Sequence, residues 1–167
     1  MTYRRPAWDD YFMSLAKIVA TRSTCDRLRA GAVLVKDRRI ISTGYNGAPP
    51  GLPHCDGEAG HKMEEGHCIR TVHGEENCIL QAAALGGSST QGSTLYTTYS
   101  PCYQCFKKLV VGGVRRIVAG AIYRDSTIAE ACREAGIEFA LYQPDPAWLE
   151  TASRIFHAPI EEKTAAK

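Results

Sequence analysis

The chain has 167 residues, 44% of them hydrophobic and 23% charged, with a formal net charge of +2. This length and composition predict one compact globular domain with a hydrophobic core of its own. The small net charge argues against a nucleic-acid polymer as partner, and no stretch approaches the roughly 18 apolar residues that a membrane-spanning helix needs.

In chain order, the first predicted element is a helix from about residue 9 to 22. Two carboxylates suit its first turn, and apolar residues recur at helical spacing, namely Tyr11, Leu15, Ile18 and Val19. Residues 30–36 and 40–45 are predicted to form a hairpin of two strands. Residues 46–68 are rich in Gly, Pro, His and Cys, show no period and are predicted to be a long loop.

A helix is predicted over residues 74–85, with Ile79, Leu80 and Ala83 on its buried face. The elements predicted after it are strands at 94–98, 116–121 and 137–142 and helices at 102–111, at 128–135 and after Pro146. The segment between the last two strands is long enough for a helix, so these strands should run parallel through a right-handed crossover.

The predicted fold class is therefore α/β, a three-layer α/β/α sandwich. Its mixed five-stranded sheet has parallel fourth and fifth strands and a hairpin at one edge. We expect residues 1–160 to form this single domain and residues 161–167 to be a flexible tail.

Seven cysteines occur in the chain, and its first residues are charged and aromatic rather than typical of a secretion signal. Cysteines in a chain without such a signal are expected to be reduced. Spaced Cys and His then indicate metal binding or catalysis more often than disulfides, and a cytoplasmic location.

The sequence His73-Gly74-Glu75 is followed by Pro101-Cys102-Tyr103-Gln104-Cys105. One imidazole and two thiolates, from His73, Cys102 and Cys105, would fill three positions of a tetrahedral zinc and leave the fourth for water. Both ligand sets are predicted at helix N-termini, whose partial positive charge lowers the pKa of a cysteine. Glu75 is predicted to be a proton carrier rather than a ligand, provided that His73 sits just before the helix.

This pattern is the H-x-E…P-C-x-x-C motif of zinc deaminases. The chain resembles the cytidine/deoxycytidylate deaminase superfamily, and the deoxycytidylate (dCMP) deaminases in particular, over roughly residues 10 to 142. Four further segments carry the resemblance: Arg22-Ser-Thr-Cys-Asp-Arg, Gly31-Ala-Val-Leu-Val, Thr43-Gly-Tyr-Asn-Gly-Ala-Pro-Pro-Gly and Leu95-Tyr-Thr-Thr-Tyr-Ser-Pro-Cys.

The resemblance implies hydrolysis of dCMP to dUMP and ammonia, in which a hydroxide held by zinc attacks C4 and Glu75 shuttles protons. It assigns the sugar to Asn46, the base to the Ser100 region and a pocket wall to Tyr123. It places the phosphate near Arg22, Ser23 and Arg27, and the fork of an arginine suits a phosphate. One departure is Gly74, where the family usually has alanine; the missing methyl is expected to enlarge the pocket floor. Whether that admits a modified cytosine stays open.

Some dCMP deaminases carry a second, structural zinc in the long loop. The resemblance favours Cys25, Cys55, His61 and Cys68 as its ligands here, with His67 or His54 as substitutes. It also makes a homohexamer plausible, activated by dCTP and inhibited by dTTP through the Gly44–Gly51 region, with Mg²⁺ accompanying the effector.

Two other interpretations remain open. The first is a deaminase of another nucleobase substrate, namely a tRNA adenosine, free cytosine or guanine; the tRNA enzyme would need a more basic face. The second is a zinc-stapled binding module without catalysis, which would not need Glu75 and would close the fourth metal position.

Overall fold

A computed structural model describes residues 5–87, 89–124 and 127–158. The predicted tail at 161–167 lies outside the described residues. The helices are α1 (Trp8–Ala20), α2 (Gly74–Leu85), α3 (Tyr103–Val111), α4 (Ile128–Glu134) and α5 (Pro146–His157). The strands are β1 (Gly31–Lys36), β2 (Arg39–Tyr45), β3 (Met63–Glu64), β4 (His67–Cys68), β5 (Thr94–Tyr99), β6 (Arg116–Ala121) and β7 (Glu138–Leu141).

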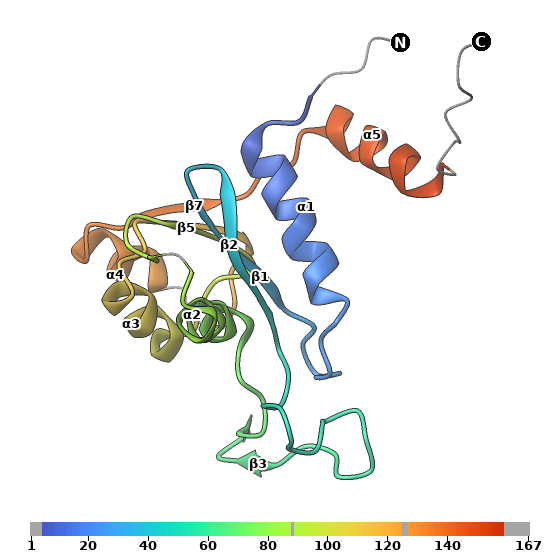
Figure 1. Ribbon diagram of the computed structural model, residues 1–167, viewed down its shortest axis with the longest axis vertical. Helices are drawn as coiled ribbons and strands as arrows, with labels where there is room; N and C mark the ends of the chain where they lie inside the picture. Colours follow the sequence, from blue (N-terminus) through green and yellow to red (C-terminus); the bar gives the residue numbers. More distant parts are fainter. Residues whose placement is uncertain (1–4, 88, 125–126, 159–167) are drawn as a thin grey trace.

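Five of these strands form one sheet in the order β2-β1-β5-β6-β7 (Figure 1). β1 pairs antiparallel with both β2 and β5, whereas β5 with β6 and β6 with β7 run parallel. The parallel pair β6–β7 is connected through α4, as a right-handed crossover requires. The predicted mixed sheet with parallel fourth and fifth strands is confirmed.

The edge hairpin owes its geometry to the two residues between its strands. Asp37 and Arg38 both have positive φ, 50° and 60°. Two consecutive residues in this region make a type I′ turn, whose twist matches that of the flanking strands. β2 is thereby folded back as the outer strand.

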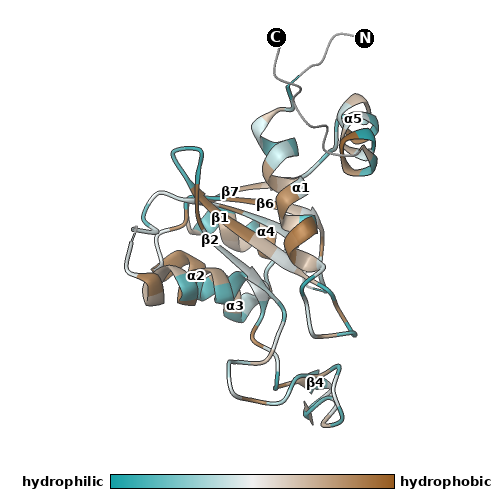
Figure 2. Ribbon diagram, turned by 45° about the vertical axis from the view of Figure 1, so that its right-hand side comes forward, coloured by the Kyte–Doolittle hydropathy of each residue, from teal (hydrophilic) through white to brown (hydrophobic). Residues whose placement is uncertain are grey.

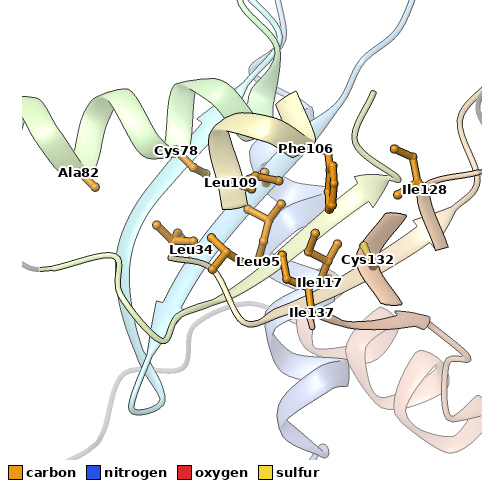
Figure 3. Close-up of a cluster of buried hydrophobic side chains, with 12 residues drawn as sticks. Leu34, Cys78, Ala82, Leu95, Phe106, Leu109, Ile117, Ile128, Cys132 and Ile137 are labelled. Atoms are coloured by element: carbon orange, nitrogen blue, oxygen red, sulfur yellow. The ribbon is translucent and has the colours of Figure 1, made fainter. Parts of the chain in front are cut away.

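Helices cover both faces of the sheet. α1 packs on one face, over a cluster formed by Phe12, Met13, Ala16, Val33, Val35, Tyr96, Val118 and Tyr142. α2, α3 and α4 cover the other face, where apolar side chains from the three helices meet those of the strands (Figure 3). The structure is thus the three-layer sandwich that the sequence predicts. Cys78 and Cys132 belong to the core between the sheet and the layer of α2, α3 and α4.

The prediction for the buried face of α2 is correct only for Ile79, which is partly buried against the core. Leu80 and Ala83 are exposed, and the buried residues are Glu75, Cys78 and Ala82, together with Gly74 at the first position. The buried stripe therefore includes one ionisable side chain, that of Glu75.

The buried face of α1 also differs from the prediction. Its buried residues are Asp10, Phe12, Met13, Ala16 and Ala20, whereas Tyr11 and Ile18 are exposed. The contact with the sheet thus combines small alanines with two large side chains, Phe12 and Met13. Leu15 and Val19 pack at its margin.

α5 buries none of its residues and lies beside the start of α1 (Figure 1). Two polar contacts hold this region. The Trp148 indole donates to Ser14 Oγ at 3.0 Å, and the Tyr142 hydroxyl donates to the buried Asp10 carboxylate at 2.6 Å. None of the helices in the described ranges has the length and apolar character that a bilayer crossing requires.

The long segment after β2 extends from one end of the sheet (Figures 1 and 2). Contrary to the prediction of an unstructured loop over 46–68, it contains the small antiparallel pair β3–β4. Its two ends are joined where Gly47 and Val72 exchange backbone hydrogen bonds of 3.2 and 2.9 Å. This bridge returns the chain directly to the start of α2.

Candidate active site

His73 is the residue immediately before α2, and its backbone is extended, with φ −72° and ψ 151°. Glu75 lies in the first turn of the helix and is only 5% exposed. Residues two apart inside a helix point to nearly opposite sides. The extended backbone at His73 therefore lets both side chains line the same cavity.

Cys102 has the same relation to α3, with φ −71° and ψ 162°, and Cys105 lies in the first turn of that helix. The Nδ1 atom of His73 lies 3.6 Å from the sulfur of Cys102 and 3.5 Å from that of Cys105. All three donor atoms lie within 4.8 Å of one another. One imidazole and two sulfurs at this spacing fit the ligand set of a catalytic zinc, with one position left for water.

Hydrogen bonds within the cluster make one of its two sulfurs acidic. Hydrogen bonding from the Cys105 thiol, followed by His73, lowers the pKa of Cys102 to about 3. The bond to Cys102 in turn raises the pKa of His73 and of Cys105. Burial raises the pKa of Glu75 to about 7, so this carboxyl is suited to exchange protons near neutral pH.

Two members of the cluster, His73 and Cys102, line a cavity of about 170 Å³. Segments far apart in the sequence form its wall: the stretch after α1, the long loop, the starts of α2 and α3, and the chain after β6. The other lining residues are Cys25, Arg27, Leu28, Ala30, Asn46, Gly66, His67, Cys68, Thr71, Glu75, Tyr99, Ser100, Tyr123 and Arg124.

A second group of thiols and an imidazole ties the long loop to the segment after α1. Donor atoms of Cys25, Cys55 and His61 lie within 4.8 Å of one another. The sulfur of Cys68 is 3.7 Å from that of Cys55 and 3.4 Å from His61 Nδ1. His61 Nε2 contacts the Asp26 carboxylate at 2.6 Å, which turns Nδ1 toward the sulfurs. A carboxylate behind the ring is the usual support of a metal-binding histidine.

The two histidines predicted as substitute ligands lie elsewhere. His54 Nδ1 is 3.1 Å from the Thr24 hydroxyl, and His67 lines the active-site cavity. Burial raises the pKa of Cys68, but hydrogen bonds from His61 and from the backbone of Arg70 outweigh it and bring the pKa to about 6. A sulfur so easily deprotonated is suited to bind a metal.

Residues 6–121 match the family model for the cytidine and deoxycytidylate deaminase zinc-binding region. The chain belongs to this family. It is 40% identical over 134 residues to ComE operon protein 2 of Bacillus subtilis, covering 80% of this chain and 70% of that one. It is 38% identical over 125 residues to the deoxycytidylate deaminase of Mycobacterium phage D29, covering 68% of this chain and 94% of that one. The crystal structure of dCMP deaminase from cyanophage S-TIM5, in complex with dCMP and dUMP, superposes with a TM-score of 0.72 at 27% identity, covering 84% of this chain and all of the other.

Within this deaminase domain, Asn46, Ser100 and Tyr123 line the cavity, as expected from the resemblance. Asn46 is buried and held at both ends of its side chain: the amide nitrogen donates to the Leu28 carbonyl at 3.1 Å, and the side-chain oxygen accepts from the Gly74 N–H at 2.8 Å. The buried Ser100 hydroxyl accepts from the Tyr123 N–H at 2.8 Å. These contacts fix the cavity wall before any ligand arrives.

The three residues predicted near the phosphate separate into two groups. Arg27 lines the cavity, whereas Arg22 is exposed and lies outside its lining. The hydroxyl of Ser23, also outside the lining, donates to the backbone carbonyl of Asn46 at 2.8 Å and accepts from the Cys25 N–H at 3.2 Å. Ser23 thus shapes the turn after α1.

Gly74 does not enlarge the cavity, contrary to expectation. A Cβ built on it would lie 3.1 Å from the Gly44 carbonyl oxygen and 3.4 Å from the Tyr45 Cα, and Gly74 is absent from the lining. A Cβ on Gly44 would in turn lie 2.2 Å from the Gly74 oxygen. A methyl group on Gly74 would point toward β2, where the backbones of α2 and this edge strand are in contact.

Sequence reasoning missed two basic side chains of the lining, His67 and Arg124. His67 was considered only as a metal ligand. Arg124 directly follows Tyr123 and stacks on its ring, 5.6 Å from the centroid. Its place beside a predicted pocket residue was the one signal available.

Proposed function

We propose that this protein hydrolyses the amino group of dCMP, giving dUMP and ammonia. The observation that carries the proposal is the cluster of His73, Cys102 and Cys105, of which His73 and Cys102 line one cavity together with the buried carboxyl of Glu75. Relatives named as deoxycytidylate deaminases and the structure solved with dCMP and dUMP support this substrate.

In this proposal, His73 Nδ1 and the sulfurs of Cys102 and Cys105 hold the zinc, which, when bound, makes a water molecule far more acidic. Glu75 takes a proton from that water and delivers it to the ring nitrogen next to C4. The oxygen of that water would bond to C4, and Glu75 would then pass the remaining proton of this oxygen to the amine, so that the C4–N bond breaks, C4 keeps the oxygen as a carbonyl and ammonia leaves. Burial of Glu75 keeps bulk water from competing for the proton.

The sugar and base are assigned to the preformed wall. The Asn46 side chain, fixed by Leu28 and Gly74, faces the sugar, and the segment around Ser100 borders the base. Tyr123 closes one side of the pocket. Since these groups are already held by hydrogen bonds within the protein, little ordering is needed on binding.

For the phosphate, the cavity lining favours Arg27 over Arg22 and Ser23. Arg124 and His67 add two more basic groups to the same lining. A guanidinium donates two parallel hydrogen bonds to phosphate oxygens, and two arginines in one lining favour a nucleotide over its nucleoside.

A second, structural zinc is proposed at Cys25, Cys55, His61 and Cys68. Three thiols and one imidazole suit zinc, and four protein ligands would make a closed site. Its effect would be to clip the long loop to the end of the first helix. Cys25 and Cys68 also line the active-site cavity, so the clip would form part of the substrate site.

The homohexamer, the dCTP and dTTP effectors with Mg²⁺, and the cytoplasmic location stay predictions from the resemblance. The proposed thiolate sites fit a reducing compartment. The Gly44–Gly51 region, assigned to the effectors, begins where β2 touches α2.

Ammonia release from dCMP, deoxycytidine, cytosine and a tRNA anticodon stem-loop, measured in parallel with and without dCTP and dTTP, tests the proposal. We expect dCMP to exceed deoxycytidine by roughly 10²–10⁴ in kcat/KM, since two charge-assisted bonds contribute ~1.5–3 kcal/mol each. Preference for cytosine or for the RNA would overturn the substrate assignment. Zinc-loaded protein inactive on all four would favour the binding module.

A further inference from the structure

Thr97 lies in β5, the central strand of the sheet, and is 1% exposed. Side chains alternate between the two faces along a strand. Thr97 therefore shares its face with Leu95, which packs under α2 and α3, and with Tyr99, which lines the cavity. That face brings its side chain beneath the first turn of α2.

The hydroxyl of Thr97 contacts two oxygens. It donates to the backbone carbonyl of Tyr99 at 2.9 Å, and it lies 3.5 Å from Oε1 of Glu75. Within the described residues, Thr97 is the side chain that hydrogen-bonds the Glu75 carboxyl. A valine would fill the same volume, so packing alone does not require a hydroxyl here.

The chemistry of a hydroxyl suits a proton carrier. It can donate one hydrogen bond and accept two. Toward a charged Glu75 it can donate to the carboxylate; toward a Glu75 that has taken a proton it can accept, with its own proton directed to the Tyr99 carbonyl. The same side chain thus serves the carboxyl before and after each transfer.

We propose that Thr97 is a positioning residue for Glu75, holding Oε1 so that the other carboxyl oxygen faces the water and the base. The proposal rests on the proposed function, because it assigns Thr97 a role in the reaction that Glu75 performs. A purely structural Thr97, serving only to bind the Tyr99 carbonyl, is the alternative.

The test compares Thr97→Val with Thr97→Ser, and Thr97→Ala with Thr97→Ser, because each pair differs in the hydroxyl. Each variant is assayed for zinc content, melting temperature, and kcat and KM on dCMP. We expect Thr97→Val and Thr97→Ala to lose about tenfold in kcat, with KM changed less than about twofold, as for one lost hydrogen bond to a reacting group. Thr97→Ser should stay within about threefold of the wild type.

A double-mutant cycle with Glu75→Gln separates the two roles. If Thr97 acts through Glu75, Thr97→Val should not further lower the residual rate of Glu75→Gln. An equal loss in both backgrounds, a Thr97→Ser variant as slow as Thr97→Ala, or a normal kcat in zinc-loaded Thr97→Val would each overturn the proposal. Wild-type protein that releases no ammonia from dCMP would instead overturn the proposed function.

Discussion

His61 Nε2 lies 2.6 Å from Oδ1 of Asp26, so the loop that precedes the active site is tied to the segment after α1 by a side-chain contact. The contact raises the pKa of His61, after the larger effect of Cys68, and it lowers that of Asp26. It also directs His61 Nδ1 toward Cys68. The geometry of the second cluster is thereby imposed by a residue outside it.

Removing one sulfur of that cluster tests its role. We expect two zinc ions per wild-type chain and one in Cys25→Ser, together with a lower melting temperature. Cys132→Ala, which changes a buried cysteine far from either cluster, should keep both ions. Metal analysis after purification without chelator measures the count. One zinc in the wild type, with unchanged stability of Cys25→Ser, would show that the loop needs no metal.

Glu75→Gln should retain the fold and the zinc, because glutamine is nearly isosteric and Glu75 is not among the three metal donors. Turnover of dCMP should fall by ~10²–10⁴, the range for a positioned acid–base group. The measurement is ammonia release at equal zinc content. Activity near that of the wild type would contradict the assignment of Glu75 as proton carrier.

Arg27→Ala should lower kcat/KM for dCMP by about 10–100-fold, since one charge-assisted bond contributes ~1.5–3 kcal/mol. Its effect on deoxycytidine should be small. Arg22→Ala is the matched control, because Arg22 is a nearby exposed arginine outside the cavity lining. A larger loss in Arg22→Ala than in Arg27→Ala would reverse the assignment.

Gly44→Ala should destabilise the protein by about 1–3 kcal/mol and lower its zinc content, because the new Cβ would meet the backbone of α2. Gly57→Ala is the control: its Cβ would come no closer than 3.6 Å to another group, and its effect should stay within about 0.5 kcal/mol. Denaturant unfolding measures both. Equal stability of the two variants would show that the helix can move off the strand freely.

Asp9 accepts two hydrogen bonds from Arg116, each 2.8 Å long, and this contact lowers the pKa of Asp9. Its stabilising effect is present above the unfolded value of ~3.9 and is lost as the pH falls through the lower folded value. Asp9→Asn should therefore destabilise by at most about 1 kcal/mol at pH 7, because the 39% exposure of Asp9 allows solvent screening.

Once the pH has fallen below the lowered folded pKa of Asp9, its carboxyl is protonated in either state, and Asp9→Asn and the wild type should approach equal stability. Glu138→Gln, at the more exposed partner of the same arginine, should have a smaller effect at pH 7. Melting temperatures across pH 2 to 7 check both statements. A difference that grows toward acid would contradict the sign.

The sequence alone predicts those site residues that belong to short local motifs. His73, Glu75, Cys102 and Cys105 were predictable because both ligand sets belong to short motifs at helix starts. The parallel strands followed from the length of the connection. Arg124 and Thr97 were not predictable: a basic residue after a strand and a threonine within one are both ordinary, and only the fold brings them to the site.

The buried faces of the helices could not be predicted fully for a related reason. Apolar spacing in α2 permits more than one stripe, and Leu80 and Ala83 satisfy helical periodicity as well as Cys78 and Ala82 do. The contact with the sheet chooses between them. The pair β3–β4 was missed because strands of two residues have no measurable period.

The backbone contact between Gly44 and Gly74 limits how this enzyme can acquire new substrates. A side chain at Gly44 would meet the backbone of α2 and shift the helix start that presents His73 and Glu75, whereas at Gly74 the space suffices for little more than a methyl group, so the floor beneath the reacting atoms leaves little room for redesign. Three other lining residues, Arg27, Tyr123 and Arg124, lie on connecting segments, which tolerate change. Changes of substrate specificity, whether selected in the laboratory or in nature, should therefore arise at these lining residues. The deamination reaction itself should stay the same.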